Sequence, residues 1–163
     1  MAIAKTLINY LEDRGIDYQL IEHAHTPTAV ASAHASHLPA HQVAKAVVLC
    51  DDAGYVISVL PANHSLEIAW VNEELDRKLT LACEDEFKKL FGDCETGAVP
   101  ALGEAYGLKV IWDDELAYTS DIYIEAGDHT HLIWLERRDF RKLMKDLPHT
   151  IISKDEEVGN WKY

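Results

Sequence analysis

The sequence is poor in cysteine, proline and glycine, and each scarcity excludes a class of protein. Three cysteines in 163 residues, Cys50, Cys83 and Cys94, are too few and too scattered for a disulfide framework, so we expect reduced thiols and a cytoplasmic protein. Five prolines and eight glycines exclude collagen-like and low-complexity chains. No apolar run approaches the ~20 residues of a membrane span, and Met1-Ala-Ile-Ala-Lys5 opens no signal peptide, so we expect no membrane partner.

Positive charge is also scarce. Fifteen Lys and Arg against 28 Asp and Glu give a formal net charge of −13. Broad, non-specific binding to DNA, RNA or anionic lipid needs a basic surface, so the composition argues against it, and we expect no DNA partner. A local basic patch remains compatible with this total.

The apolar patterning predicts an α/β fold of the α+β type. Two β-branched runs, 46–50 and 55–60, flank Asp51-Asp-Ala-Gly54, which predicts an antiparallel hairpin. Helical spacing predicts a helix within 2–13, and Thr26-Pro27-Thr28 begins a second one that ends near Ser36. We further expect strands at 18–22, 66–69, 79–81, 108–113, 121–125 and 131–135, and helices at 71–77, 84–91 and 137–145.

These elements do not alternate strictly, so they indicate a mixed, mostly antiparallel sheet of six or seven strands with helices packed outside it. The length is typical of one domain. We expect this domain to span residues 1–147 and a solvated C-terminal tail to follow at 148–163.

Lys45 is isolated, because it is the only Lys or Arg between Arg14 and Arg77. On a strand its side chain would share a face with Val47 and Leu49. If that face is buried, the ammonium needs an acceptor or a ligand, since an unpaired buried charge is very costly. The alternative is a lysine at the mouth of the strand whose alkyl stem carries the charge to water.

A loop with three glycines follows the predicted helix at 84–91. From Phe91 it reads Phe-Gly-Asp-Cys-Glu-Thr-Gly-Ala-Val-Pro-Ala-Leu-Gly, and it ends at Gly103. Glycine lets backbone approach a ligand closely, and consecutive N–H groups can hold a carbonyl oxygen or an anion. Ordinary turn formation is the alternative. Cys94 in this loop is either a nucleophile or, more simply, a small buried residue.

Together, the two segments resemble the YbaK/ProX family, which comprises free-standing aminoacyl-tRNA deacylases and the editing domain inserted in bacterial prolyl-tRNA synthetase. The resemblance is carried by Val43-Ala-Lys-Ala-Val-Val-Leu49 and Asp93-Cys-Glu-Thr-Gly-Ala-Val-Pro-Ala-Leu-Gly103. It extends to Gly15–Thr28 and Ile122–Ile133, so it implies that residues 1–147 form a YbaK/aminoacyl-tRNA synthetase-associated domain.

The resemblance implies trans-editing: hydrolysis of the ester that joins a wrong, small amino acid to the 3′ end of a tRNA. Mischarged tRNA is then the partner, an aminoacyl-tRNA synthetase is a further candidate partner, and no cofactor or metal is implied. Lys45 is assigned to substrate positioning, and loop N–H groups to the carbonyl oxygen, where such donors stabilise an oxyanion. The catalytic loop positions implied are Gly97, Ala98, Val99 and Ala101, with Gly103 as a substrate contact. A substrate hydroxyl helps to activate the water in this family, so no Ser/His/Asp triad is required.

Histidines supply further candidate contacts. We expect His23 and His25 to shape the rim of the pocket. His129 and His131 should lie on one side of a strand, where they either line the pocket or face solvent. A zinc site at three histidines, His34, His37 and His41, is disfavoured, because Pro39 interrupts their helical spacing.

A basic stripe is predicted on the helix at 137–145, where Arg137, Arg141 and Lys145 repeat every four residues. A solvated helix face is the simpler interpretation. Contact with tRNA phosphates is the functional one, and it would reconcile an acidic protein with an RNA substrate.

The chain departs from the family pattern at three positions, and one of them is His23, where the family often has an aromatic residue. Ala101 stands where the family commonly has proline, and Leu132 stands where some deacylases have an acid. With the acidic composition, these departures motivate a second hypothesis, a non-catalytic binding module whose pocket holds a nucleotide, an amino acid or a synthetase partner.

Overall fold

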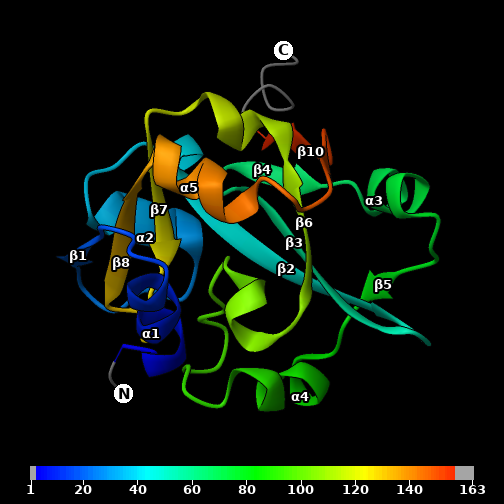
Figure 1. The fold of residues 1–163 in the computed structure, drawn as a ribbon, viewed down its shortest axis with the longest axis horizontal. Coiled ribbons are helices and arrows are strands. Elements are labelled where there is room, and N and C mark those ends of the chain that lie inside the picture. The colour runs from blue at the N-terminus through cyan, green and yellow to red at the C-terminus, as the bar shows by residue number, and fades with distance from the viewer. Residues whose placement is uncertain (1–2, 157–163) are drawn as a thin grey trace.

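The computed structural model describes residues 3–156 (Figure 1). Its α-helices are α1 (Lys5–Asp13), α2 (Ala29–Ala35), α3 (Ile68–Leu75), α4 (Glu84–Phe87) and α5 (Arg137–Met144). Its strands are β1 (Gln19–Glu22), β2 (Val43–Asp51), β3 (Gly54–Pro61), β4 (His64–Leu66), β5 (Thr80–Leu81), β6 (Lys109–Asp113), β7 (Asp121–Glu125), β8 (His131–Glu136), β9 (His149–Thr150) and β10 (Ser153–Asp155). Short 3-10 helices lie at η1 (Ala40–Gln42), η2 (Lys88–Phe91), η3 (Gly103–Tyr106) and η4 (Asp114–Tyr118).

The main sheet of the described residues has eight strands. Seven follow the order β1-β8-β7-β2-β3-β6-β9, and β5 pairs with β2 beside this path. The pairs β1–β8, β7–β8, β2–β3 and β2–β5 are antiparallel, whereas β2–β7, β3–β6 and β6–β9 are parallel. The expected mixed, mostly antiparallel sheet is therefore confirmed, with one strand more than the upper number predicted.

The two edges of β2 are paired differently. β3 runs along one edge from Ala44 to Asp51, as the hairpin pattern predicted. On the other edge, β7 pairs only at Val43 and Ala44, and β5 pairs only at Leu49 and Cys50. Between these two short pairings, no strand of residues 3–156 covers this edge of β2. The middle of the longest strand is therefore open on one side.

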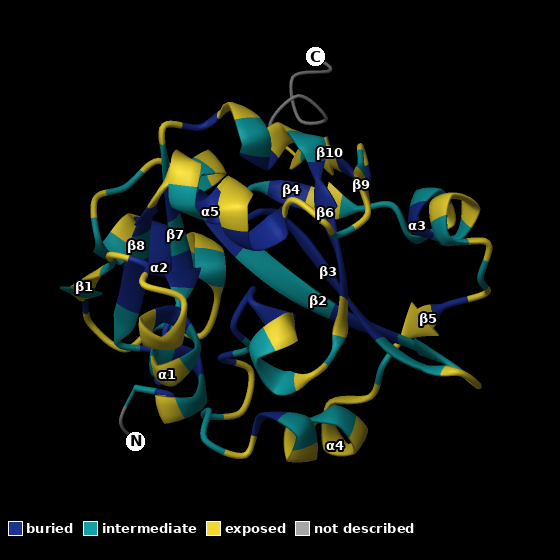
Figure 2. Cartoon of the chain, in the orientation of Figure 1, coloured by how far each residue is buried: buried dark blue, intermediate teal, exposed yellow. Residues whose placement is uncertain are grey.

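Helices cover both faces of the sheet, and the buried strands lie between them (Figure 2). Ala44 and Val48 of β2 belong to the core on the face covered by α1 and α5. Val43 and Leu49 belong to cores on the opposite face, beneath α2 and α3. Side chains alternate along a strand, so Lys45 shares this second face. The prediction of helices packed outside the sheet is confirmed.

Some predicted elements differ from the structure. Only the first residue of the strand expected at 66–69 is in a strand, because β4 ends at Leu66 and α3 begins at Ile68. The helix expected at 84–91 divides into α4 and η2. The expectation of a solvated tail from residue 148 is wrong for 149–155, because β9 pairs with β6 and β10 pairs with β4. The rest of the predicted tail, 157–163, lies outside the described residues.

No helix of residues 3–156 meets the length and hydropathy that crossing a bilayer requires. The longest of them, α1, has nine residues, against the ~20 of a membrane span.

A buried aspartate joins the C-terminal strands to the sheet. Asp113, the last residue of β6, has 0% of its surface exposed. Its Oδ2 accepts hydrogen bonds from the Ile152 N–H at 3.0 Å and from the Ser153 hydroxyl at 2.6 Å. Ser153 Oγ also lies 2.8 Å from Nδ1 of the buried His64. The carboxylate therefore fixes the segment that contains β10.

Replacing Asp113 with alanine leaves these buried donors without an acceptor. We expect Asp113→Ala to lower the free energy of unfolding by about 3 kcal/mol, as measured by urea denaturation. The matched control, Asp52→Ala in the exposed hairpin turn, should change it by less than about 0.5 kcal/mol. Equal effects of the two variants would contradict this account of Asp113.

Candidate functional site

A cavity of about 160 Å³ lies at the open edge of β2. Four segments surround it: the residues that lead into α2, the first half of β2, the glycine loop, and the region from the end of β7 to the start of β8. Its lining residues are Pro27, Thr28, Ala29, Val43, Ala44, Lys45, Ala46, Gly97, Val99, Glu125, His129 and Leu132. Two predicted features, Lys45 and the glycine loop, therefore meet at one concavity.

The backbone of Ala46 faces this cavity. The Val43 C=O accepts a hydrogen bond from Ala62 on the β3 side, whereas the Val48 C=O accepts one from Ala82 on the open side. The N–H and C=O of one residue point the same way in an antiparallel ladder, and the direction reverses at each residue. Ala46 therefore directs both groups toward the open edge, where an N–H can meet a bound oxygen.

Lys45 brings a positive charge to the cavity. Its side chain is half-buried and shares the sheet face expected for it. Burial lowers the pKa of Lys45, and the negative charge of Glu156 partly offsets this effect. Among residues 3–156 the ammonium forms no ion pair within 4.0 Å. The charge is thus only partly solvated and is available to a ligand.

Glu125 is a cavity residue that the sequence analysis missed. It ends β7 and lines the cavity with Lys45. Burial raises the pKa of this carboxyl, and hydrogen bonds to Oε1 from the N–H groups of Gly127 (3.3 Å) and His129 (3.2 Å) partly oppose the rise. A sequence signal existed: Ile122 and Ile124 face the core, so the alternation places Glu125 on the face that carries Lys45.

The glycine loop reaches the cavity with only part of the predicted set. Gly97 and Val99 line it, and Gly97 has a left-handed backbone with φ +84°. The N–H of the buried Ala98 already donates to the Glu95 C=O at 3.0 Å, so it is not free for an oxyanion. The structure therefore places Gly97 and Val99, and not Ala98, where a loop N–H can meet a ligand.

The later residues of the loop are part of the core. Ala101 is 1% exposed and packs among the side chains beneath α1 and α5. A Cβ added to Gly103 would lie 2.9 Å from Val110 Cγ2 and 3.0 Å from Ile57 Cδ1. Ala101 and Gly103 do not line the cavity, and the glycine at 103 allows close packing of η3 on the sheet.

His129 holds the glycine loop against the turn before β8. Its Nε2 lies 2.7 Å from the Thr96 C=O, and since a carbonyl only accepts, Nε2 carries the proton. His129 has φ 61° and precedes β8, so it does not share a strand face with His131, contrary to expectation.

The other three predicted histidines lie beside the cavity, and they do not line it. The ring of the exposed His25 stacks at a tilt on that of His129, 5.2 Å between centroids, and its Nε2 lies 3.7 Å from Glu95 Oε1. His23 is buried, with Nδ1 2.6 Å from the Ala24 C=O. His131 contacts Asp128 at 2.7 Å through Nδ1. Only His25 therefore occupies a rim-like position.

The two remaining chemical candidates have little support in the structure. Burial raises the pKa of Cys94 to about 11, so its thiol stays protonated at neutral pH and is a poor nucleophile. Across residues 3–156 no group of three or more His, Cys, Asp or Glu side chains has an arrangement suited to a metal ion, and this includes the trio of His34, His37 and His41.

The predicted basic stripe lies apart from the cavity. Arg137, Arg141 and Lys145 are exposed on α5 or at its end. α5 buries Phe140 in the core on its own face of the sheet, whereas Lys45 extends on the opposite face. Arg141 also donates a hydrogen bond to the Ala117 C=O. These exposed cations can meet a larger partner that spans the surface, but not a small ligand in the cavity.

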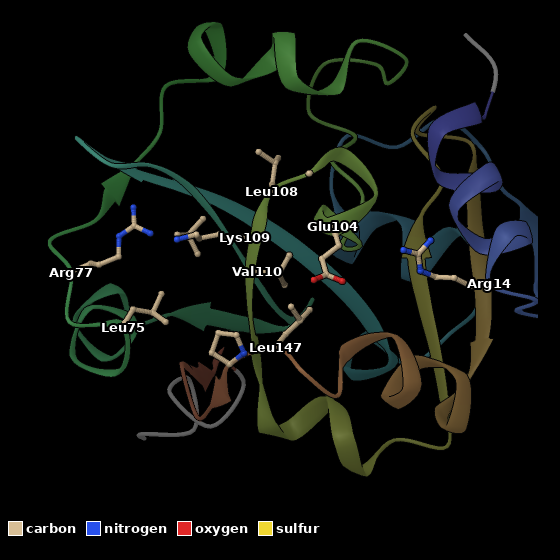
Figure 3. Close-up of a pocket in the computed structure, with 11 residues that line it drawn as sticks. Arg14, Leu75, Arg77, Glu104, Leu108, Lys109, Val110 and Leu147 are labelled. Atoms are coloured by element: carbon tan, nitrogen blue, oxygen red, sulfur yellow. The ribbon is translucent and has the colours of Figure 1, made fainter.

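A larger cavity, about 660 Å³, lies across β6 between the ends of α1 and α3 (Figure 3). Its arginines already have partners. Arg77 donates two hydrogen bonds to Asp51 and lowers the pKa of that carboxyl to about 2. Arg14 lies over the Tyr10 ring, 3.6 Å from its centroid. With both of its arginines engaged and none of the predicted catalytic residues lining it, this cavity is the weaker candidate.

Comparisons with known proteins agree with this geometry. A family model described as the aminoacyl-tRNA editing domain matches residues 23–143. A hypothetical protein, APE2540, has a similar structure, with a TM-score of 0.81, 20% identity and coverage of 92% of this chain and 100% of its own. The structure of a proposed trans-editing enzyme for prolyl-tRNA synthetase is also similar, with a TM-score of 0.80 and 21% identity. The similarity covers 93% of this chain and 96% of that one.

A third solved structure, a proposed signal transduction protein from Marinobacter aquaeolei VT8, has a TM-score of 0.76 and 18% identity. The similarity covers 93% of this chain but only 31% of that one. No curated protein sequence matches the chain.

At these identities the solved structures show the fold alone. The family match is independent of them, spans more than half of the chain, and contains Lys45, Glu125 and the whole glycine loop. It confirms the YbaK/ProX resemblance found in the sequence. The chain belongs to the aminoacyl-tRNA editing domain family.

Proposed function

We propose that the protein is an aminoacyl-tRNA deacylase that acts in trans and hydrolyses the ester between a small amino acid and the 3′ end of a mischarged tRNA. The observation that carries the proposal is the meeting of Lys45, the outward backbone of Ala46 and the Gly97–Val99 segment around one small cavity. The similar protein described as a trans-editing enzyme supports the same assignment.

The cavity offers donors where charge develops during ester hydrolysis. Attack by water converts the carbonyl oxygen to an oxyanion, and the C–O bond to the ribose then breaks, with a proton passing to the ribose oxygen. The Lys45 ammonium and the N–H of Ala46 approach this oxygen from β2, and the N–H groups of Gly97 and Val99 approach it from the loop. Donors fixed before reaction stabilise an oxyanion without reorganising. A hydroxyl of the terminal ribose activates the water.

The size of the cavity favours a small aminoacyl group. Its apolar wall includes Ala29, Val43 and Leu132, which come from three different elements and are held by the core under α2. Each extra methylene that has to fit against such a wall changes discrimination by ~1–3 kcal/mol. A side chain of one or two heavy atoms fits this space better than a branched or aromatic one.

The first test is deacylation of a panel of mischarged tRNAs. We expect the wild-type protein to accelerate ester loss from small aminoacyl-tRNAs, and Lys45→Ala to reduce that rate by about 100-fold or more. Lys78→Ala removes the same charge from an exposed site outside the cavity, so it should retain the wild-type rate. If the wild-type protein accelerates ester loss on no member of the panel, the deacylase proposal is wrong.

The second test concerns the basic stripe on α5. We expect replacement of Arg137, Arg141 and Lys145 by alanine to weaken tRNA binding and to reduce the salt dependence of the affinity. With fewer phosphate contacts, binding releases fewer counterions from the tRNA. The control removes three other exposed cations, Lys5, Lys78 and Lys109. Equal loss of affinity in both triple variants, measured by filter binding across a salt series, would show that only net charge matters.

A further inference from the structure

Two opposite charges line the cavity without forming an ion pair. Lys45 and Glu125 are both lining residues, and they come from the neighbouring strands β2 and β7. The register ends at Ala44 opposite Ile124, so Lys45 and Glu125 are the next residues on each strand. Among residues 3–156, their charged groups do not approach within 4.0 Å of each other. Both side chains therefore border the same cavity, and the negative charge that acts on Lys45 is that of Glu156.

The Glu125 carboxylate is only partly satisfied by the protein. Oε1 accepts the N–H groups of Gly127 and His129 at 3.3 and 3.2 Å. Within the described residues Oε2 has no hydrogen-bond donor, and the other wall residues bring mainly apolar or backbone surface. Asp128 and His129 are the other titratable groups whose charge acts on Glu125. A half-buried carboxylate that keeps one oxygen toward a cavity is suited to a cationic ligand group.

An aminoacyl ester carries such a group at a fixed place. Its α-ammonium is bonded to the carbon next to the ester carbonyl, so the partners of the ammonium and of the carbonyl have to lie a few ångströms apart. Neighbouring strands are ~4.8 Å apart. Adjacent residues of β2 and β7 can therefore address the two ends of one aminoacyl group.

Resting on the deacylase function proposed above, we propose that Glu125 binds the α-ammonium of the aminoacyl ester while Lys45 and the Ala46 N–H face its carbonyl and ribose end. Glu125 is then a specificity-determining residue. It selects esters with a free, charged α-amino group and rejects those whose amine is acylated, such as peptidyl-tRNA, because a neutral amide would leave the carboxylate unpaired.

Two esters on the same tRNA distinguish binding of the α-ammonium by Glu125 from an effect of Glu125 on the attacking water or on the fold. Alanyl-tRNA carries the ammonium, and lactyl-tRNA, made from it by deamination, carries a hydroxyl of similar size in its place. Each enzymatic rate is divided by the spontaneous hydrolysis rate of the same ester, because the ammonium also activates the ester chemically. Glu125→Gln removes the charge and retains the shape and the acceptor oxygen. Glu73→Gln on the exposed face of α3 is the matched control.

We expect Glu125→Gln to lower the normalised rate on alanyl-tRNA by about 10- to 100-fold and to leave the rate on lactyl-tRNA within about 3-fold. Glu125→Asp, which retains the charge, should recover part of the preference for alanyl-tRNA, and Glu73→Gln should behave as the wild type. A urea denaturation curve for each variant confirms that it is folded.

The other outcomes overturn the inference in distinct ways. An equal loss on both esters would mean that Glu125 acts on the water or on the fold, and no change on either would mean that it does not contact the substrate. If the wild-type protein hydrolyses neither ester nor any other mischarged tRNA, the deacylase function itself fails and the role of Glu125 fails with it.

Discussion

The site depends on an interruption in the pairing of β2. An unpaired strand edge usually invites another strand, and proteins cover such edges with loops, bulges or charge. Here β7 and β5 occupy the two ends of the edge, and between them the glycine loop and the turn before β8 approach it in place of a strand. Loops leave backbone donors unpaired where a ladder would use them, and so the same interruption creates both the concavity and the N–H of Ala46 that faces it.

The loops around the cavity hold one another in place. The Glu95 N–H donates to the Gly127 C=O at 2.7 Å, and His129 donates to the Thr96 C=O at the same distance. Gly127 has φ +102°, and a Cβ there would lie 2.9 Å from Ala4 Cβ, so glycine is needed both for the turn and for the approach of α1. Cross-linked in this way, short segments far apart in the sequence form a site that is preorganised, as oxyanion stabilisation requires.

Local features of the sequence predicted the fold well, and non-local ones were missed. The hairpin of β2 and β3 follows from two β-branched runs and one turn, all within residues 46–60. In contrast, β9 and β10 are two and three residues long and carry no periodic signal. They form because Asp113, some forty positions earlier, holds Ile152 and Ser153. A pairing of that kind depends on tertiary contacts that no local pattern contains.

The same distinction applies to the site. Lys45 could be predicted because the sequence alone shows that no other Lys or Arg lies between Arg14 and Arg77. Glu125 looked like an ordinary polar position at the end of a strand, since its burial depends on where β7 stops pairing with β2. Of the loop, Gly97 and Val99 line the cavity, whereas Ala101 and Gly103 pack in the core. The glycine content of a loop indicates that the segment can approach a ligand. Which of its residues line the cavity depends on how the loop packs in the folded protein.

Under the proposed function, the acidic total charge and an RNA substrate are compatible, because affinity and selectivity would have different sources in this architecture. Five of the 15 Lys and Arg lie within residues 137–145, on a helix that covers the face of the sheet opposite Lys45. Phosphate contacts position a nucleic acid without reading what is attached to its end. In the proposal, the amino acid is distinguished separately, by a cavity of about 160 Å³ whose lining includes Lys45 and Glu125 on adjacent strands.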